Sequence, residues 1–382
     1  MPAPTLSRRE LNRATLARQG LLEPISSGSI ADAVRRAGSL QAQHPEWPPV
    51  ALWSRAGNRA IDGLPAALRD HSVVRAALMR ITVHIVAASD FWAMSALAQP
   101  LRHLQFRSIF KADAVDSPLG RRLSAGHAAV RAALRERPLR IRDMDAIMAA
   151  ELPELAGHPN RIFWRHIAAS LPLVHVPFDG EGYGRSRYAL AEAWLDPPPA
   201  DLDEPAALRH LAVSYLRAFG PAGIDDLAAY AGRRGPPTRW RRAMDDLGDR
   251  IEPFVDDNGG ELYDLADAPR PGADSDAPPR LLARWDSLLL SHATARRQRV
   301  IADEHRAAVY TKNADVLPTI LVDGMVAGTW EMDRAATGGR IIMRPFARLR
   351  PEIELTLEAE AHRLVALVAP GSESQSVILE RM

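Results

Sequence analysis

The chain has 382 residues, 47% of them hydrophobic and 25% charged, so it is long enough for about two or three domains and has the composition of a soluble globular protein. It contains no cysteine, which excludes disulfides, thiol nucleophiles and cysteine-ligated metals. It has no run of about 18 apolar residues, which excludes a transmembrane helix. The formal net charge of +1 does not by itself indicate a nucleic-acid partner. Residues 1–11 lack the apolar core of a signal peptide, so we expect the chain in the cytoplasm.

The positive charge is carried almost entirely by arginine. Of the 48 basic residues only Lys111 and Lys312 are lysines. A GC-rich coding sequence accounts for such a bias, but the bias still limits the chemistry. Schiff-base catalysis would have to use one of these two lysines or the N-terminus. Arginine is also well suited to bidentate contacts with phosphate.

Capping and turn residues divide the first part of the chain into helices followed by a strand. Ser7 and Glu10 have the spacing of a capping box, and Ser29 with Asp32 marks the start of a second helix. Prolines at the start and Gly57 at the end delimit a third helix. Alternating β-branched residues then predict a strand, which completes the order of a winged-helix unit. The expected helices cover residues 8–20, 30–43, 48–57, 72–80 and 90–106, and the expected strand covers residues 81–87.

The same order of elements recurs twice further along the chain, although the copies share little sequence. The second copy ends in a predicted β-hairpin over residues 173–190, with a glycine-rich tip at residues 180–184. After a Pro- and Asp-rich linker at residues 195–206, the third copy ends in a strand pair that turns at Asn258-Gly259. The expected helices cover residues 124–138, 140–152 and 160–172 in the second copy, and 207–220, 223–232 and 236–248 in the third.

The last part of the chain has a different character. After a second linker at residues 268–279, short runs of strand-like sequence predict a small β-rich domain, with Asp323-Gly324 as a hairpin turn and a closing helix over residues 352–367. The expected strands cover residues 305–311, 316–332, 339–348 and 363–370. We therefore expect a mainly α protein with α+β winged-helix units, in which three tandem winged-helix domains precede a C-terminal β-barrel-like domain. The expected boundaries are 1–115, 116–200, 201–270 and 271–382.

Winged helices usually bind duplex DNA, with the third helix in the major groove and the wing on the backbone. The third helices expected here carry suitable arginines: Arg161 and Arg165 in the second copy, and Arg239 in the third. A solvated arginine-rich face is the alternative for each residue taken alone. Winged helices also serve as protein-interaction modules, so the fold does not settle the function. The sequence has no phosphate loop, dinucleotide fingerprint, Gly-x-Ser-x-Gly motif or His-Glu-x-x-His motif, and its histidines are too scattered to predict a metal site.

Four blocks in order resemble the winged-helix DNA glycosylase family typified by AlkZ and YcaQ. LQAQHPEWPPVALWSR, at residues 40–55, contains the family's Gln-x-Gln motif, and residues 78–94 resemble its Arg-Gly-Thr-x-His-x-Val strand. Residues 281–301 resemble its Leu-Pro-x-Phe-Asp-x-x-Leu-Leu segment, and residues 313–330 its C-terminal hairpin. The resemblance covers nearly the whole chain. The departures are Ile81 in place of glycine, Ala283 in place of proline and Trp285 in place of phenylalanine.

The resemblance implies that the domains form a C around duplex DNA, and that the enzyme hydrolyses the N-glycosidic bond of cationic alkylpurines, of the N7-alkylguanine or N3-alkyladenine type. Bulky adducts and interstrand crosslinks are included, in DNA repair or in self-resistance to a genotoxin. Glutamine at the second motif position, Gln43, goes with the AlkZ branch, whereas aspartate goes with the YcaQ branch. A monomer at the nucleoid, without cofactor or metal, is expected.

Chemistry explains why Gln41 and Gln43 would suit such a reaction. An alkylated purine cation already leaves well, so the enzyme has to place a water beneath C1′ and stabilise an oxocarbenium-like sugar. A neutral amide offers a carbonyl acceptor and an NH₂ donor for that water, and does not repel phosphates. Such positioning contributes on the order of 3–5 kcal/mol. No lysine adjoins the motif, so we expect a monofunctional hydrolase without lyase activity.

Further residues are assigned to supporting roles. His84 is expected to contact phosphate or lesion, with a packed strand histidine as the alternative, and Glu46 is the alternative base. Trp47 and Trp53 are expected in the core rather than stacked on the lesion. A non-catalytic winged-helix regulator or lesion-binding protein, or a protein that sequesters the genotoxin, remains an alternative to the enzyme. Additional expected DNA contacts are Arg55, Arg80, Arg296, Arg297, Lys312 and Asn313.

Overall fold

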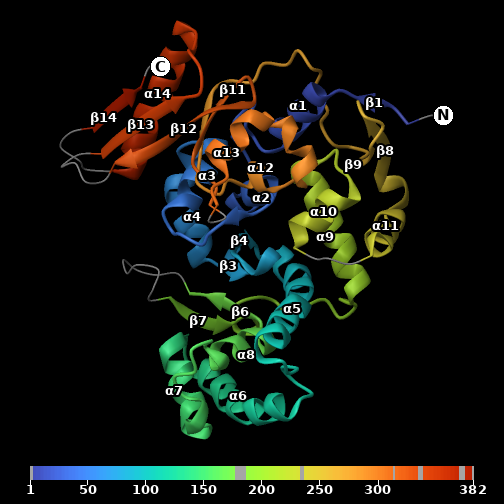
Figure 1. Ribbon diagram of the computed structural model, residues 1–382, viewed down its shortest axis with the longest axis vertical. Helices are drawn as coiled ribbons and strands as arrows, with labels where there is room; N and C mark the ends of the chain where they lie inside the picture. Colours follow the sequence, from blue (N-terminus) through green and yellow to red (C-terminus); the bar gives the residue numbers. More distant parts are fainter. Residues whose placement is uncertain are drawn as a thin grey trace. The chain divides into compact units, whose positions relative to one another are not determined.

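A computed structural model describes residues 3–176, 186–232, 236–312, 315–333, 339–369 and 375–380. The chain, drawn in Figure 1, divides into two compact units. The first unit consists of residues 1–64, 212–230 and 234–382, and the second of residues 65–211 and 231–233. This division is coarser than the four expected domains, whose boundaries stay a prediction. In the part of the chain that the structure describes, no helix is both long and apolar enough to span a membrane.

The helix starts expected near the N-terminus are confirmed. Ser7 accepts a hydrogen bond from the backbone of Glu10 and forms a capping box with it, and Ser29 does the same with Asp32. Gly57 follows the third helix with a φ of +59°. The structure adds a fourth helix that was not expected. The helices are α1 (Arg8–Arg18), α2 (Ile30–Arg36), α3 (Trp47–Ala56) and α4 (Arg59–Arg69).

The second helix ends earlier than expected. It stops at Arg36, because Gly38 and Ser39 have positive φ angles of +74° and +115° that leave the helical conformation. A side chain at position 38 would also lie 2.3 Å from the Phe219 ring, so glycine permits a close approach there. The chain continues as the short strand β2 (Leu40–Gln41). The two glutamines of interest therefore lie after the helix, not at its end.

The second unit contains a strand where a helix was expected. Residues 72–80 include β3 (Val73–Ala77), which pairs antiparallel with β4 (Val83–Ala87) in the register Val73 to Ala87. Its paired valines suit a pleated, half-buried surface better than a helix. Within this unit the strand order is β4-β3-β6-β7-β5. The other strands are β5 (Leu139–Arg140), β6 (Leu173–His175) and β7 (Arg187–Leu190).

The remaining helices of the second unit pack around a core that includes Phe106, Leu123, Met144 and Ile167. The element order of three helices and an antiparallel strand pair agrees with the expected second copy. The expected hairpin tip at residues 180–184 lies outside the described residues. The helices are α5 (Ala88–Phe110), α6 (Pro118–Glu136), α7 (Ile141–Glu151) and α8 (Ile162–Ser170).

The third expected copy also has its elements in the expected order. Helices α9 (Glu204–Phe219), α10 (Ile224–Ala231) and α11 (Pro237–Asp245) precede strands β8 (Ile251–Asp256) and β9 (Glu261–Leu265). The strands are antiparallel, and the turn between them contains Asn258-Gly259, as expected. The N-terminal strand β1 (Thr5–Leu6) extends this pair by parallel pairing with β8.

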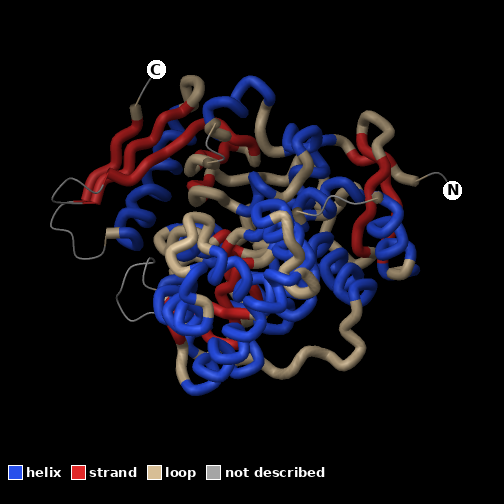
Figure 2. The backbone as a smooth tube through the Cα atoms, turned by 60° about the horizontal axis from the view of Figure 1, so that its bottom comes forward, coloured by secondary structure: helices blue, strands red, loops and turns tan. Residues whose placement is uncertain are grey.

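The C-terminal region is an open sheet, so the expectation of a barrel-like domain is wrong. The described strands follow the order β10-β11-β12-β13-β14, and β10 and β14 are edge strands. The long helix α14 packs against β13 and β14, as Figures 1 and 2 show. The hairpin at Asp323-Gly324 is confirmed. The strands are β10 (Arg280–Leu282), β11 (Thr319–Val322), β12 (Met325–Asp333), β13 (Gly339–Pro345) and β14 (Gln375–Leu379).

Two expected strands of this region are helical. Residues 305–311 contain α13 (Arg306–Val309), and residues 363–368 form the last turns of α14 (Pro351–Val368). In both segments the apolar residues form a short continuous run, which does not distinguish a strand from a helix. One further short helix, α12 (Ser287–Leu290), follows β10 and is important for the candidate site.

Candidate functional site

The Gln-x-Gln segment lies in the first unit, between β2 and the start of α3. Ala42 is completely buried, whereas Gln41 is half-buried and Gln43 is exposed. This alternation is typical of extended chain, in which successive side chains point to opposite sides. The small buried alanine therefore anchors the segment, and the two amides flank it.

Helix α3, which follows the segment, is tied to α12 by a buried ion pair. The Arg55 guanidinium donates to both carboxylate oxygens of Asp286 at 2.9 and 2.7 Å, and both side chains are 0% exposed. Arg55 also donates to the Gln19 side chain at 2.5 Å. Asp286 in turn caps α12 by accepting from the Leu288 backbone at 2.9 Å. Arg55 is therefore a structural residue, and the expectation that it contacts DNA is wrong for this conformation, since no part of it reaches the surface.

Aromatic and charged side chains surround the loop that follows Gln43. The His44 ring stacks on Trp285 with centroids 4.9 Å apart and planes at 21°. The Glu46 carboxylate lies 3.9 Å from His44 Nδ1. Arg284 lies over the Trp285 ring at 5.0 Å and is paired with Asp315. The hydrogen bond to Asp315, together with the negative charges of Asp315 and Glu46, raises the pKa of Arg284. His44 and Arg284 carry no sequence signal of their own beyond adjacency to the Gln-x-Gln motif and to Trp285.

The tryptophans of this region are in the core, as expected. Trp47 is 9% exposed and Trp53 is 5% exposed. Trp47 contacts Trp330 edge to face, with centroids 5.8 Å apart. The Trp330 indole donates to the Leu282 carbonyl at 2.8 Å, so these rings connect α3 to the C-terminal sheet.

His84, on β4 of the second unit, is buried with 1% exposure. Its Nδ1 lies 2.8 Å from the Thr82 carbonyl, which identifies Nδ1 as the protonated nitrogen, since a carbonyl can only accept. Nε2 is therefore an acceptor, and it has no partner among the described residues. Burial, reinforced by the charge of Arg80, lowers the pKa of His84 to about 3. This burial agrees with the alternative of a packed strand histidine, and a contact of His84 with phosphate or lesion stays a prediction.

The backbone beside His84 is strained. Arg80 and Ile81 have φ angles of +55° and +58°, in the left-handed region that a β-branched side chain rarely adopts. Glycine is the residue that fits this conformation without a steric cost. Strain next to a buried, unsatisfied acceptor is typical of functional sites.

The other basic residues expected to contact DNA lie in different settings. Arg161, before α8, and Lys312 are exposed, and the half-buried Arg165 donates to the Asn160 carbonyl at 2.9 Å. Arg80 and Arg239 are half-buried. Asn313 lies outside the described residues.

Arg296 and Arg297 are engaged within the first unit. Arg296 is 19% exposed and lies 2.7 Å from Asp225 and 3.4 Å from Asp226, so its charge is largely neutralised. Arg297 lies over the Tyr310 ring at 4.7 Å, donates through Nε to the His292 carbonyl at 3.3 Å, and is a half-buried residue. Of the two, Arg297 is the better placed to meet a phosphate.

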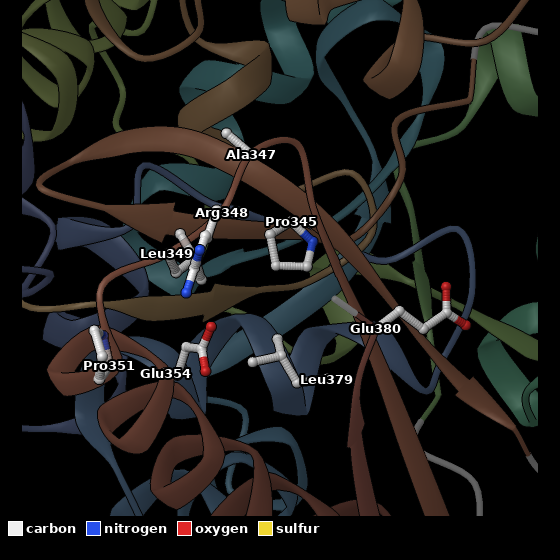
Figure 3. A pocket seen from close by; sticks show the side chains of 8 residues that line it. All are labelled: Pro345, Ala347, Arg348, Leu349, Pro351, Glu354, Leu379 and Glu380. Carbon is white, nitrogen blue, oxygen red and sulfur yellow. The ribbon is translucent and has the colours of Figure 1, made fainter. Parts of the chain in front are cut away.

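A separate hollow of about 340 Å³ lies beside β13 and the start of α14, as Figure 3 shows. Its lining combines prolines and leucines with Arg348, Glu354 and Glu380. Glu380 is paired with Arg344 at 2.8 Å. None of the glutamines or histidines discussed above lines this hollow, and among the described residues no cluster of histidines and carboxylates is arranged to hold a metal ion.

The family model described as DNA glycosylase AlkZ-like matches residues 34–367. The chain belongs to the AlkZ-like DNA glycosylase family. The match includes the Gln-x-Gln segment, the strand with His84 and the segment with Asp286. The match therefore confirms, over most of the chain, the resemblance to AlkZ-like glycosylases that the four sequence blocks indicated.

Two similar proteins come from Streptomyces sahachiroi. An interstrand DNA cross-link repair glycosylase is 30% identical over 148 residues, which are 36% of this chain and 37% of that protein. The aligned part is therefore little more than a third of that relative's length. The solved structure of the DNA glycosylase AlkZ has a TM-score of 0.78 with this chain at 21% identity, and covers 98% of this chain and 100% of the other. This AlkZ-like chain shares that fold.

Proposed function

We propose that this protein is a monofunctional DNA glycosylase that hydrolyses the N-glycosidic bond of cationic alkylated purines in duplex DNA. Its substrates would be of the N7-alkylguanine or N3-alkyladenine type, with bulky adducts and interstrand crosslinks included. The observation that carries the proposal is the Gln41-Ala42-Gln43 segment, in which the two amides flank a buried alanine. Family membership and the name of the cross-link repair relative support it.

Gln41 and Gln43 are the proposed catalytic pair. The purine cation is already a good leaving group, so the demand on the enzyme is to orient a water beneath C1′ and to stabilise positive charge on the sugar. An amide carbonyl accepts from the water, and the amide NH₂ of either residue can orient it. This mechanism needs no strong acid or base, which fits two side chains that do not titrate.

His84 and Glu46 are the proposed supporting residues. The Nε2 acceptor of His84 is buried and has no partner among the described residues, so it is suited to receive a hydrogen bond from an enclosed water. The Glu46 side chain is 31% exposed and lies in the same loop as the glutamines, so it is the alternative base. If Glu46 is the base, the rate of excision requires the Glu46 carboxylate. In the glutamine mechanism, the rate of excision does not require it.

We further propose that the three helix-and-strand groups are winged-helix modules on one monomeric chain, and that arginines of their third helices contact the DNA backbone. Arg161 and Arg165 flank the start of α8, and Arg239 lies on α11. When a winged helix binds duplex DNA, side chains of its third helix contact phosphates or base edges in the major groove. Arg80, Arg297, Lys312 and Asn313 complete the proposed set of contacts.

The test is incubation with a duplex that carries a single N7-methylguanine, with free N7-methylguanine measured by mass spectrometry and abasic sites by mild alkali. The wild-type chain is expected to release the base, and Gln41→Ala and Gln43→Ala to lose about 10²-fold or more in rate. Gln105→Ala, an exposed glutamine on α5, is the matched control and should be unaffected. No release by the wild type contradicts the enzyme proposal, and binding without release would favour the lesion-binding alternative. Full activity in both glutamine variants would leave a glycosylase but reject the proposed pair.

A further inference from the structure

The stack of His44 on Trp285 connects the loop after Gln43 to the segment between β10 and α12. We propose that His44 is a positioning residue, whose ring, by lying on Trp285, holds the Gln41 and Gln43 amides in their reactive arrangement. This inference rests on the proposed glycosylase function and adds a residue to it. It concerns the face of the imidazole, not its ability to exchange a proton.

Trp285 is a fixed platform for such a contact. Its φ angle is +53°, a left-handed conformation that a bulky L-residue rarely adopts and that persists only where neighbours hold it. The Trp285 backbone donates to the Val316 carbonyl at 3.0 Å, and the next residue is the fully buried Asp286. The ion pair of Asp286 with Arg55 therefore restrains the backbone next to Trp285.

The Trp285 side chain is also held. Arg284 lies over the ring at 5.0 Å, which is a favourable cation–π distance, and its guanidinium donates through Nε to Asp315 at 2.8 Å. Asp315 itself is only 18% exposed. The indole is thus held by a neighbouring guanidinium that is itself anchored.

The stack lies in the short connection between β2 and α3. Ala42 is buried, and helix α3 does not begin until Trp47, so the intervening residues lie in irregular chain. His44 is 53% exposed, yet its ring lies nearly parallel to the indole. With Ala42 buried on one side of Gln43 and His44 stacked on the other, the loop is held on both sides of that amide. A displacement of about 1 Å at such a position can cost 10²-fold in rate.

The alternative role for His44 is proton exchange with Glu46, because the Glu46 carboxylate lies 3.9 Å from His44 Nδ1. Substitution separates the roles. His44→Phe retains a flat ring that can stack but cannot carry a proton, whereas His44→Ala loses both properties. His362, an exposed histidine on α14, provides the matched control as His362→Ala.

Single-turnover excision from the N7-methylguanine duplex is the first measurement, with DNA affinity measured in parallel. His44→Ala is expected to slow excision by about 10-fold to 100-fold with unchanged affinity, and His44→Phe to stay within about threefold of wild type with the same pH–rate profile. Trp285→Ala should match His44→Ala, and the double variant should be no slower than either, since both remove one contact. Trp285→Phe retains an aromatic ring, so it tests the stack even if Trp285→Ala does not fold.

Hydrogen exchange of the peptide covering residues 40–47 is the second measurement and needs no activity. Exchange should rise in His44→Ala and stay at the wild-type level in His44→Phe and His362→Ala. Unchanged exchange in His44→Ala overturns the inference, as does a His44→Phe variant that is as slow as His44→Ala. A wild-type chain that excises no base would refute the proposed function, and the exchange result would still show whether the stack orders the loop.

Discussion

The guanidinium of Arg55 and the carboxylate of Asp286 form a bidentate ion pair at 2.9 and 2.7 Å in which neither side chain reaches solvent. The pair joins α3 to α12, and so joins the helix after the Gln-x-Gln segment to the backbone that carries Trp285. Removing one member of a buried pair leaves an uncompensated charge, which is far more costly than losing the attraction itself.

Asp286→Ala is therefore expected to lower the free energy of unfolding by about 3–5 kcal/mol, measured by urea denaturation. Glu192→Ala is the control, because Glu192 pairs with Arg131 at 3.0 Å with both side chains about 40% exposed. Its expected cost is below about 1 kcal/mol, since solvent screens an exposed pair. Equal effects of the two substitutions would contradict a structural role for the buried pair. The double variant Arg55→Met, Asp286→Leu should be more stable than Asp286→Ala alone.

His166 on α8 should make the second unit sensitive to acid. The side chain is 0% exposed, and neither ring nitrogen has a partner among the described residues. Burial, reinforced by His127 and His103, lowers the pKa of His166 to about 4 from its usual 6.5. Because the unfolded chain then binds a proton at higher pH than the folded chain, the free energy of unfolding falls as pH decreases from about 6.5 and levels off below about 4.

The size of this effect is at most about 3–4 kcal/mol, from about 1.4 kcal/mol for each of about 2.5 pH units. His166→Phe should flatten the dependence of stability on pH in this window, and should be more stable than wild type at pH 5. Thermal unfolding from pH 4 to 8 measures both. An unchanged pH dependence in His166→Phe would assign the acid sensitivity to other groups.

Ile81 offers a test of backbone strain that is independent of its side-chain contacts. Its φ is +58°, so alanine at this position retains the steric conflict and glycine relieves it. We expect Ile81→Gly to be more stable than Ile81→Ala by about 1 kcal/mol, the reverse of the usual order within regular structure. Both variants lack the isoleucine side chain, so the comparison isolates the backbone. An Ile81→Ala variant more stable than Ile81→Gly would mean that the strain is relieved elsewhere.

His84 should influence excision without introducing a titration near neutral pH. Its pKa is lowered to about 3 by burial and by Arg80, so it stays neutral across the working range. We expect His84→Leu to slow excision of N7-methylguanine, with a ratio of wild-type to variant rates that is constant from pH 5 to 8. A ratio that changes with a midpoint near 6.5 would show that His84 acts as a cation. His84→Gln, which keeps an acceptor, should be the milder substitution.

Local chemistry determined the parts of this fold that the sequence predicted correctly. Ser7, Ser29 and Gly57 set helix ends through hydrogen bonds or backbone conformations within a few residues, and Asn258-Gly259 and Asp323-Gly324 set turns in the same way. The Gln-x-Gln segment was also recognisable from sequence, because it is one of four blocks that resemble the family's motifs and follow each other in the family's order.

Only the tertiary structure decided the rest, because the deciding partners are distant along the chain. Residues 73–77 are a strand because β4 pairs with them, and the described strands of the C-terminal sheet end in two edge strands, β10 and β14. Arg55 has the charge of a DNA contact, but Asp286, 231 residues away, removes it from solvent. The stack of His44 on Trp285 likewise joins segments that no local pattern connects. Sequence determined which side chains were available, and folding decided which of them reach solvent and which contact each other, since burial and pairing depend on the whole chain.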